Sequence, residues 1–483
     1  MKKTVNHILV AGLLALLSLA SCTDEFIEGN YLQGVDRDKR VEVRLPFGVG
    51  RGITTTITTR AAGGEIDYDS QLSGVMAFVY EAKSDNPEEN ELLAYHLFSN
   101  PSNKPLEGAT GGWIADNDDP TCGEIKFYVP VGDVYIYLLG NAQSSFLNFF
   151  PGVSGGDALG TQAEFFEKAT PKWNGNIHSV DGYLPLTGMV NNNTGLCHVN
   201  EQGQISYTDE EGKTHILLPD GKHDEDNSFV LKRLMSKITM NIREGKGVKF
   251  TARDYTVRHI PHYVSPTAQA WTEEERDRIL VEDAKPVNFG LLDSLTFTIY
   301  LPENIRKVRS GVEITEYRQR DKVVKTADNK NTEETAPDDF HADNADNHKG
   351  HYKFEFAPKA STYIELTGWF ENADKTVAAD VRYYIHLGNF GKDLNHFSVE
   401  RDHHYTYNVT INGVDDIVVE VEDENEKTPG AEGVVFKHEA FAHIDAHFDQ
   451  VEMKFMRKDI ENGVYLYTDT PFGVMGVMYY PKG

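Results

Sequence analysis

Cysteine is scarce in this sequence. Of 483 residues only Cys22, Cys122 and Cys197 are cysteines, and none stands in a Cys-x-x-Cys spacing or beside a group of histidines. A structural zinc site usually combines four Cys or His ligands, arranged in pairs at short spacings. The sequence therefore argues against a zinc-stabilised fold.

Basic residues are in deficit. The chain has 47 Lys and Arg against 75 Asp and Glu, which gives a formal net charge of −28. Nucleic-acid binding depends on cations that neutralise phosphates, so this charge argues against nucleic acid as a partner and against adsorption to an anionic membrane surface. An acidic exterior mainly keeps an exposed protein soluble.

Two common catalytic signatures are absent. The sequence has no glycine-rich phosphate loop and no Cys/His nucleophile pattern. The adjacent pair His403-His404 would need a nucleophile and an orienting acid, and neighbouring residues of a strand point to opposite faces. We therefore predict that the protein is not an enzyme and requires no cofactor.

Two polar segments have the composition of metal ligands. His443, Asp445, His447 and Asp449 lie two residues apart, so on a strand they share one face, as the ligands of a transition metal can. Asp116–Asp119 offers oxygen ligands for calcium, but it lacks the spacing of an EF-hand. We interpret the first segment as a solvated polar face and the second as a surface turn, and we predict no metal site.

Only one long hydrophobic run is present, and it lies at the N-terminus. Lys2 and Lys3 precede an apolar run over residues 8–19, and the run ends in Leu-Ala-Ser-Cys at residues 19–22. This is the three-part pattern of a secretory signal, and its end resembles the lipobox of bacterial lipoproteins; the alternative is an ordinary signal with an incidental cysteine. Several acyl chains on Cys22 would anchor the protein stably where one chain would not.

The lipobox predicts export, and it bears on the two remaining cysteines. In an oxidising setting Cys122 and Cys197 either form a disulfide or remain two buried thiols. The acidic residues just after Cys22 fit a surface-export tether or simply a solvated leash. We predict an outer-membrane lipoprotein that faces outward.

The pentapeptide Leu-Pro-Leu-Thr-Gly at residues 184–188 spells a cell-wall sorting signal. Such a signal needs an apolar span and a basic tail close to the C-terminus, whereas a polar stretch and almost 300 further residues follow here. A Pro and a Gly that bracket a short apolar stretch more often mark a strand end and its turn. We therefore interpret the motif as a turn and assign the tether to Cys22.

Short runs of alternating apolar residues dominate the rest of the chain. They favour an all-β fold of antiparallel sandwiches with few short helices; the runs are Val-Glu-Val-Arg-Leu-Pro-Phe (41–47), two runs that turn at residues 130–133, and those at 236–242, 294–302, 362–370, 381–388 and 404–413. Helical patterns begin only at Thr161 and at Thr272, where Glu275 completes a capping box.

The composition along the chain suggests five segments. These are a signal peptide (1–21), a tether (22–40), an N-terminal sandwich (41–243), a C-terminal sandwich (244–425) and a strand-bearing extension (426–483). An acidic insert at residues 326–351 contains too few apolar residues to bury a core and is predicted to be a mobile loop.

Several segments together resemble the fimbrillin-type lipoproteins, the subunits and accessory proteins of type V pili. The resemblance runs over about residues 41–425. Its elements are the strand pair ending in Gly-Asn-Ala at 140–142, Leu-x-Arg and Ser-Lys-Ile within 231–238, and the stretch 387–421, where Asp402 replaces the usual Asn. Thr-Thr-Arg-Ala-Ala at 58–62 resembles the segment in which such subunits are cut after Arg.

The resemblance implies two transthyretin-like β-sandwich domains and assembly by strand exchange. A protease would cut between Arg60 and Ala61 and remove the first strand, and a strand of a neighbouring subunit would fill the groove. Val451, Met453 and Phe455 lie on one face of a candidate donor strand. The implied partners are other fimbrial subunits, outer-membrane lipid through Cys22, and a host or bacterial surface receptor.

Two other functions remain open from the sequence. A glycan-binding surface lipoprotein would also be all-β, but it would display exposed aromatic platforms, and the four tryptophans at 113, 173, 271 and 369 are scattered. A secreted hydrolase on a β-scaffold would need carboxylates that converge in space. The sequence also leaves open a stalk, tip or anchor role.

Overall fold

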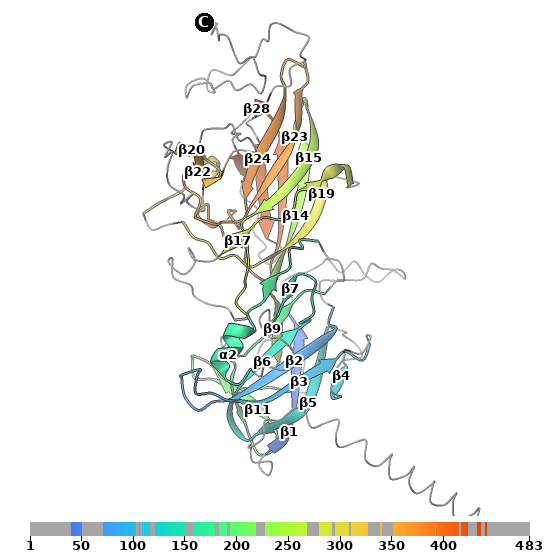
Figure 1. Cartoon of the computed structure of the whole chain (residues 1–483), viewed down its shortest axis with the longest axis vertical. Helices are drawn as coiled ribbons and strands as arrows, with labels where there is room; N and C mark the ends of the chain where they lie inside the picture. The colour runs from blue at the N-terminus through green and yellow to red at the C-terminus, as the bar shows by residue number, and fades with distance from the viewer. Residues whose placement is uncertain are drawn as a thin grey trace, which may run out of the picture.

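A computed structural model describes residues 40–50, 71–102, 111–115, 121–149, 159–178, 183–190, 194–218, 228–267, 280–291, 295–308, 311–326, 351–391, 393–414 and 417–423, with short pieces at 106, 109, 339–340, 432–435 and 440–441. Within these ranges the chain is almost entirely β-structure, which confirms the predicted all-β class. Figure 1 shows two groups of strands stacked along the long axis of the molecule.

The first group is one 11-stranded sheet. Its order is β12-β11-β10-β6-β9-β13-β1-β5-β4, with β2 paired to β6 and β3 paired to β2. The strands are β1 (Arg40–Val49), β2 (Gly74–Glu81), β3 (Leu92–Ser99), β4 (Trp113–Ala115), β5 (Cys122–Pro130), β6 (Gly132–Gly140), β9 (Leu186–Gly188), β10 (Leu196–Val199), β11 (Ile205–Thr208), β12 (Thr214–Ile216) and β13 (Phe229–Arg233).

The second group contains two five-stranded sheets. One has the order β19-β14-β25-β26-β27 and the other β18-β15-β23-β24-β28. Their strands are β14 (Met235–Glu244), β19 (Thr296–Pro302), β25 (His404–Ile411), β26 (Ile417–Asp423) and β27 (Glu432–Val435), and β15 (Val248–Arg258), β18 (Val287–Asn288), β23 (Tyr363–Asn372), β24 (Ala378–His386) and β28 (Ala440–Phe441).

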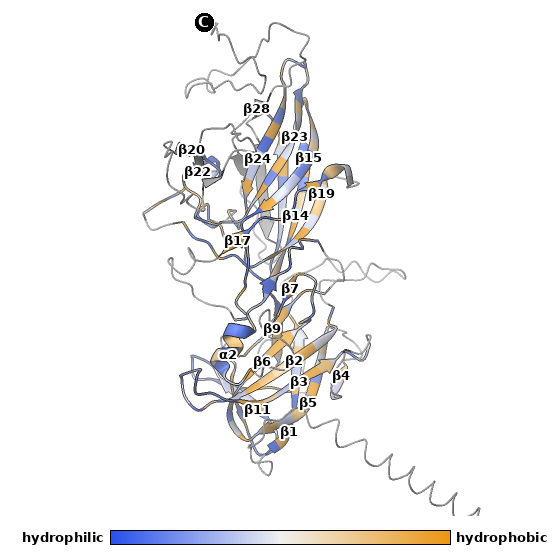
Figure 2. Cartoon of the chain, viewed as in Figure 1, coloured by the Kyte–Doolittle hydropathy of each residue, from blue (hydrophilic) through white to orange (hydrophobic). Residues whose placement is uncertain are grey.

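Both groups follow the alternation expected of half-buried strands. Figure 2 shows hydrophobic and hydrophilic residues interleaved along them, since successive side chains of a strand face opposite sides. The two sheets of the second group share one apolar core; Tyr255 on β15 and Phe297 on β19 stack with ring centroids 3.9 Å apart.

The remaining elements are short. They are β7 (Leu147–Asn148) with β8 (Lys172–Trp173), β16 (Ile260–Pro261) with β17 (Val281–Glu282), the sheet of β20 (Val323–Thr326), β22 (His351–Phe354) and β21 (Asp339–Phe340), the helix α2 (Gln162–Lys168), and the 3₁₀ turns η3 (Phe289–Leu291) and η4 (Tyr317–Gln319). Strand β21 belongs to the acidic insert 326–351, whose middle otherwise lies outside the described residues.

The helix predicted from Thr161 is present as α2. The Thr161 side chain accepts a hydrogen bond from the backbone N–H of Glu164, and the Glu164 side chain accepts one from the N–H of Thr161. This reciprocal pair satisfies two backbone donors that a helix start leaves open. The second predicted helix, from Thr272, falls mostly outside the described residues.

Two strand pairs run parallel, which the sequence analysis did not predict. Strand β1 is parallel to β13 over Phe47–Val49, and β14 is parallel to β25 over Lys237–Glu244. A parallel pair cannot be closed by a tight turn, and in both cases a long stretch of chain connects the two strands. The other pairs between described strands are antiparallel.

The chain passes from the first group to the second between β13 and β14. The predicted boundary at residue 243 assigned β14 to the first domain, whereas β14 pairs with β19 and β25 of the second group. The segment between α2 and β9 also contacts the second half of the chain. The N–H of Trp173 donates to the carbonyl of His262 at 2.9 Å, and the N–H of Tyr300 donates to that of Ile177 at 2.8 Å.

Of the two predicted turns, one is present and one is not. The chain does turn between β5 and β6, but the two strands do not pair with each other: β5 lies beside β1, and β6 beside β2, β9 and β10. The segment 184–188 is not a turn, because Leu186–Gly188 forms β9 between β6 and β13. Leu184 and Leu186 are buried, so the sequence that resembles a sorting signal belongs to the core of the first group.

Candidate functional site

Strand β1 lies in the interior of the first sheet, between β5 and β13. It pairs with β5 along Arg40–Gly48 and with β13 along Phe47–Val49. The next described residue after Gly50 is Gln71. The first strand of the sheet is therefore joined covalently to the other described strands only through residues 51–70.

One face of β1 is part of the core. Val43, Leu45 and Phe47 have no exposed surface, and burying each contributes about 2 kcal/mol. The Phe47 ring packs edge-on against Trp113, with centroids 4.9 Å apart. Gly123 on β5 leaves the necessary space, because a Cβ there would lie 3.2 Å from Phe47 and 2.9 Å from a backbone oxygen.

The other face of β1 carries alternating charges that β5 complements. The Arg44 guanidinium contacts the carboxylate of Glu124 through Nε at 2.8 Å and Nη2 at 2.6 Å. Glu42 lies 3.1 Å from the ammonium of Lys126. Glu124 is buried, whereas both side chains of the second pair are more than a third exposed, so the Arg44 pair contributes more to the register of β1.

The end of β1 is held by a buried arginine. Arg233, the last residue of β13, donates from Nη1 to the carbonyl of Gly50 and to Oδ1 of Asp402, both at 2.8 Å. Its side chain is 1% exposed. Asp402, at a backbone φ of 60°, precedes β25 of the second group. The guanidinium of Arg233 on β13 thus links the end of β1 to the segment that precedes β25 in the second group.

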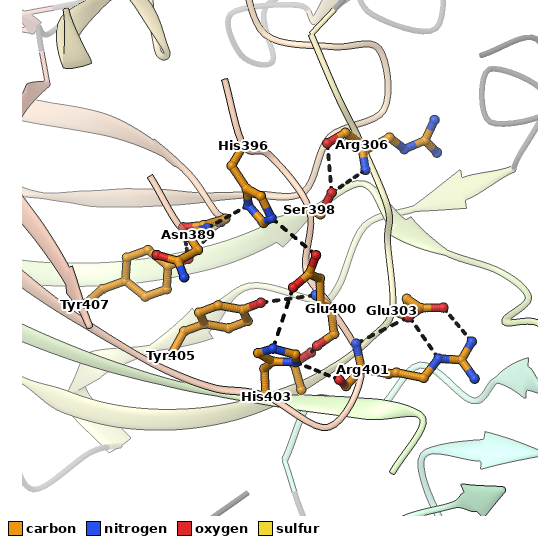
Figure 3. A network of polar contacts seen from close by, with 12 residues as sticks. Glu303, Arg306, Asn389, His396, Ser398, Glu400, Arg401, His403, Tyr405 and Tyr407 are labelled. Carbon is orange, nitrogen blue, oxygen red and sulfur yellow. Dashed lines mark hydrogen bonds and ion pairs between the residues drawn. The ribbon is translucent and has the colours of Figure 1, made fainter. Parts of the chain in front are cut away.

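A polar network fixes the segment around Asp402 (Figure 3). Arg401 donates from Nε to Glu303 at 2.8 Å and from Nη2 to the carbonyl of Ser265 at 2.9 Å. Glu400 accepts from His396 at 3.3 Å, and this hydrogen bond lowers the pKa of the Glu400 carboxyl below its ordinary value. The network ties residues 396–403 to Glu303, directly after β19, and so fixes the chain on either side of Asp402.

The histidine pair of the sequence analysis does not converge. His404 bonds Thr239 through Nε2 at 3.0 Å, whereas His403 bonds the carbonyl of Arg401 through Nδ1 at 2.8 Å. Cys122 is half-buried and Cys197 is buried, and the two are not joined by a disulfide. Burial raises the pKa of the Cys197 thiol well above its ordinary value, which makes that thiol unreactive.

Several predicted positions lie outside the described residues. These are Cys22, Arg60, Ala61, Asp116–Asp119, Trp271 and the segment 443–449. In the part of the chain that the structure describes, no three or more His, Cys, Asp or Glu side chains form a metal-binding group. Within the same ranges, none of the helices combines the length and hydrophobicity of a membrane span.

The tryptophans that the structure describes form no exposed platform. Trp173 is buried in the core, and Trp113 packs on Phe47. Trp369 is half-buried on β23. The role of Arg233 was missed by sequence reasoning, although the Leu-x-Arg pattern that contains it was noticed; its partner Asp402 lies 169 residues away.

Comparisons with known proteins give one family match and several structural similarities. Residues 299–409 match a sequence family described as a domain of unknown function, DUF4906; this stretch includes most of the network in Figure 3. No curated protein sequence matches the chain.

Three solved structures are similar over most of their length. The tip fimbrial protein Mfa3 from Porphyromonas gingivalis, truncated at its C-terminus, is 14% identical with a TM-score of 0.41, over 80% of this chain and 99% of that one. A putative cell adhesion protein from Parabacteroides distasonis is 9% identical with a TM-score of 0.38, over 84% and 100%. Putative polysaccharide binding proteins from Bacteroides thetaiotaomicron are 10% identical with a TM-score of 0.31, over 80% and 99%.

Proposed function

We propose that this protein is a surface-displayed lipoprotein that acts as a structural or accessory subunit of type V-like fimbriae, assembled by protease-triggered strand exchange and serving adhesion. The observation that carries the proposal is the position of β1: an interior strand whose only covalent link to the other described strands runs through residues 51–70. One cut in that link would turn an integral strand into a separate, exchangeable peptide.

The chemistry of the vacated place suits a replacement strand. Loss of β1 would leave unpaired backbone groups along β5 and β13. It would also open the apolar cavity that the side chains of Val43, Leu45 and Phe47 now fill. Exposed strand edges and apolar surface bind extended segments by β-augmentation. Removal of β1 and refilling of its groove are therefore energetically coupled. A donor strand from a neighbouring subunit would pair with the open backbone groups and cover the apolar surface.

The proposed activation cut is Arg60-Ala61. Treatment of the purified chain with an Arg-specific protease should yield a new N-terminus at Ala61, read by Edman degradation, followed by polymers visible by electron microscopy. Arg60→Ala should abolish both results, whereas Arg51→Ala, a change in the same link, should leave them intact. Absence of cleavage at Arg60, or cleavage without assembly when partner subunits are supplied, contradicts the proposed assembly.

The proposed anchor is the acylated Cys22, which places the protein in the outer membrane, facing outward. Cys22→Ala should move the protein from the membrane fraction to the soluble fraction, because no acyl chain would then hold it. Ser21→Ala, one residue earlier, should stay with the membranes. A Cys22→Ala protein that remains membrane-bound and still incorporates labelled palmitate would contradict the anchor.

A further inference from the structure

The second group of strands contains a cavity of about 210 Å³. Its walls come from His259, just after β15, from His386 at the end of β24, and from the segment 354–361 between β22 and β23. Val312 at the rim is 39% exposed, so a solute can enter from the surface. A cavity of about 150 Å³ holds benzene, so this one has room for a single aromatic ring with a substituent.

The His386 ring lines this cavity and has one nitrogen without a partner. Its Nδ1 donates to Oδ1 of Asp321 at 2.7 Å, and both side chains are buried. Its Nε2 is also buried, and no residue in the described ranges forms a hydrogen bond with it. Buried polar atoms almost always have a partner, so an atom that lacks one calls for an explanation, such as a ligand.

His259 lines the same cavity from a backbone conformation that few residues adopt. Its φ is 59°, and that of Ala360, another residue of the wall, is 54°. Such positive φ values strain a residue that has a side chain, and they cluster at ligand sites. Asp283 accepts a hydrogen bond from the N–H of His259 at 3.0 Å, and Thr362 donates one to its carbonyl at 2.9 Å. These contacts hold the His259 ring at the cavity wall.

Both imidazole rings offer hydrogen-bond acceptors rather than charges. Burial lowers the pKa of His259 and of His386 below the ordinary value of histidine, so both rings are neutral near pH 7. The Nδ1 of His259 donates to the carbonyl of Ser361 at 3.2 Å, as the Nδ1 of His386 donates to Asp321. A neutral imidazole carries one N–H, so the Nε2 of each ring is an acceptor. A ligand for this cavity must therefore supply a donor.

Apolar residues make up more than half of the wall. They are Val312, Phe354, Phe356, Ala357, Pro358 and Ala360. The Phe354 ring stands edge-on to His386, with centroids 4.4 Å apart. A sugar would leave most of its hydroxyls unpaired among these groups, which is costly. A cation would lose its hydration, and the nearby carboxylates are already in use, because Asp321 bonds His386 and Glu355 pairs with Lys322.

We propose that this cavity binds a phenolic group, either a free phenol or the tyrosine side chain of a partner protein, through a hydrogen bond from the phenol hydroxyl to Nε2 of His386. The ring would lie among the apolar residues of the wall, and the hydroxyl would satisfy the nitrogen that now has no partner in the described ranges. The inference does not rest on strand exchange, because the strands that carry the cavity do not pair with β1.

Two ligands of the same shape test the hydrogen bond without any change to the cavity. p-Cresol is the tyrosine side chain as a free molecule, and p-xylene has a methyl group in place of its hydroxyl. In NMR titrations of the full chain with Cys22→Ser, p-cresol should bind about tenfold more tightly than p-xylene, the effect of one hydrogen bond. Equal affinity for the two ligands, or no binding of p-cresol, overturns the proposal.

A substitution in the wall locates the binding. Ala357→Leu should weaken the binding of p-cresol by about tenfold or more, because the larger side chain takes up space that the ring needs. Ala378→Leu, the same change at an exposed position of β24, is the matched control and should leave the affinity unchanged. Circular dichroism checks that both variants are folded. Unchanged affinity in a folded Ala357→Leu protein overturns the site; if that variant does not fold, the two ligands of equal shape still decide.

The two sources of the phenol are distinguished with N-acetyltyrosinamide, which carries the backbone of a tyrosine residue. Binding as tight as that of p-cresol assigns the tyrosine side chain of a partner protein, whereas binding of p-cresol alone assigns a free phenol. N-acetylphenylalaninamide, which lacks the hydroxyl, should bind about tenfold more weakly than N-acetyltyrosinamide if the latter binds. Methyl glucoside serves as a sugar probe, and tighter binding of the sugar than of p-cresol overturns the assigned class of ligand.

Discussion

Phe47→Ala is expected to lower the free energy of unfolding by about 3–5 kcal/mol, the usual cost of emptying an aromatic site in a core. The Phe47 ring has no exposed surface and lies 4.9 Å from the ring of Trp113. The cavity cannot collapse easily, because Gly123 and the backbone of β4 already approach closely on that side. Urea unfolding followed by far-ultraviolet circular dichroism measures the loss.

The same substitution should also speed the release of β1 once the link at residues 51–70 is cut, by at least tenfold, since the lost contacts are those that hold the strand. Glu42→Ala on the outer face of the strand is the control; its side chain is 42% exposed, so both effects should be small. Equal losses of stability in the two variants would mean that β1 is not held by its inner face.

Local periodicity is why the strands could be predicted. Alternation over 41–47, 236–242, 294–302, 362–370 and 404–413 is a direct consequence of one buried face, and each run is a strand in the structure. Pairing depends instead on contacts between distant segments. The turn at residues 130–133 could be read from its Pro and Gly, but nothing local says that β5 joins β1 while β6 joins β2.

In the candidate site, too, the buried face of the strand could be predicted from the sequence, whereas its pairing partners could not. The apolar face of β1 follows from its own residues, whereas its interior position depends on β13, which lies about 180 residues further along the chain. Leu184–Gly188 has the Pro and Gly typical of a turn, yet Gly188 lies within β9, where a Cβ would meet Leu231 at 2.7 Å. Close packing, rather than backbone flexibility, accounts for that glycine.

Arg233→Met is the second variant with a large expected effect. The guanidinium is 1% exposed and donates to the carbonyl of Gly50 and to Asp402, both at 2.8 Å. Removing one member of a buried ion pair costs about 3–5 kcal/mol, because the remaining charge loses its partner in a poorly solvated place. Methionine keeps the length of the side chain, so the loss reports the polar contacts more than the volume.

The consequence should extend beyond stability, because Arg233 connects three parts of the chain. With Arg233→Met, calorimetry should resolve separate transitions for the two strand groups, and β1 should leave a cut chain faster. Asp402→Asn should cost less, since an amide oxygen can still accept from Arg233 and Asn tolerates the positive φ of this position. Arg243→Met, at the exposed end of β14, is the matched control. A change at Arg233 as mild as that at Arg243 would show that Gly50 and Asp402 are held in place by other contacts, and that release of β1 is not coupled to the second group.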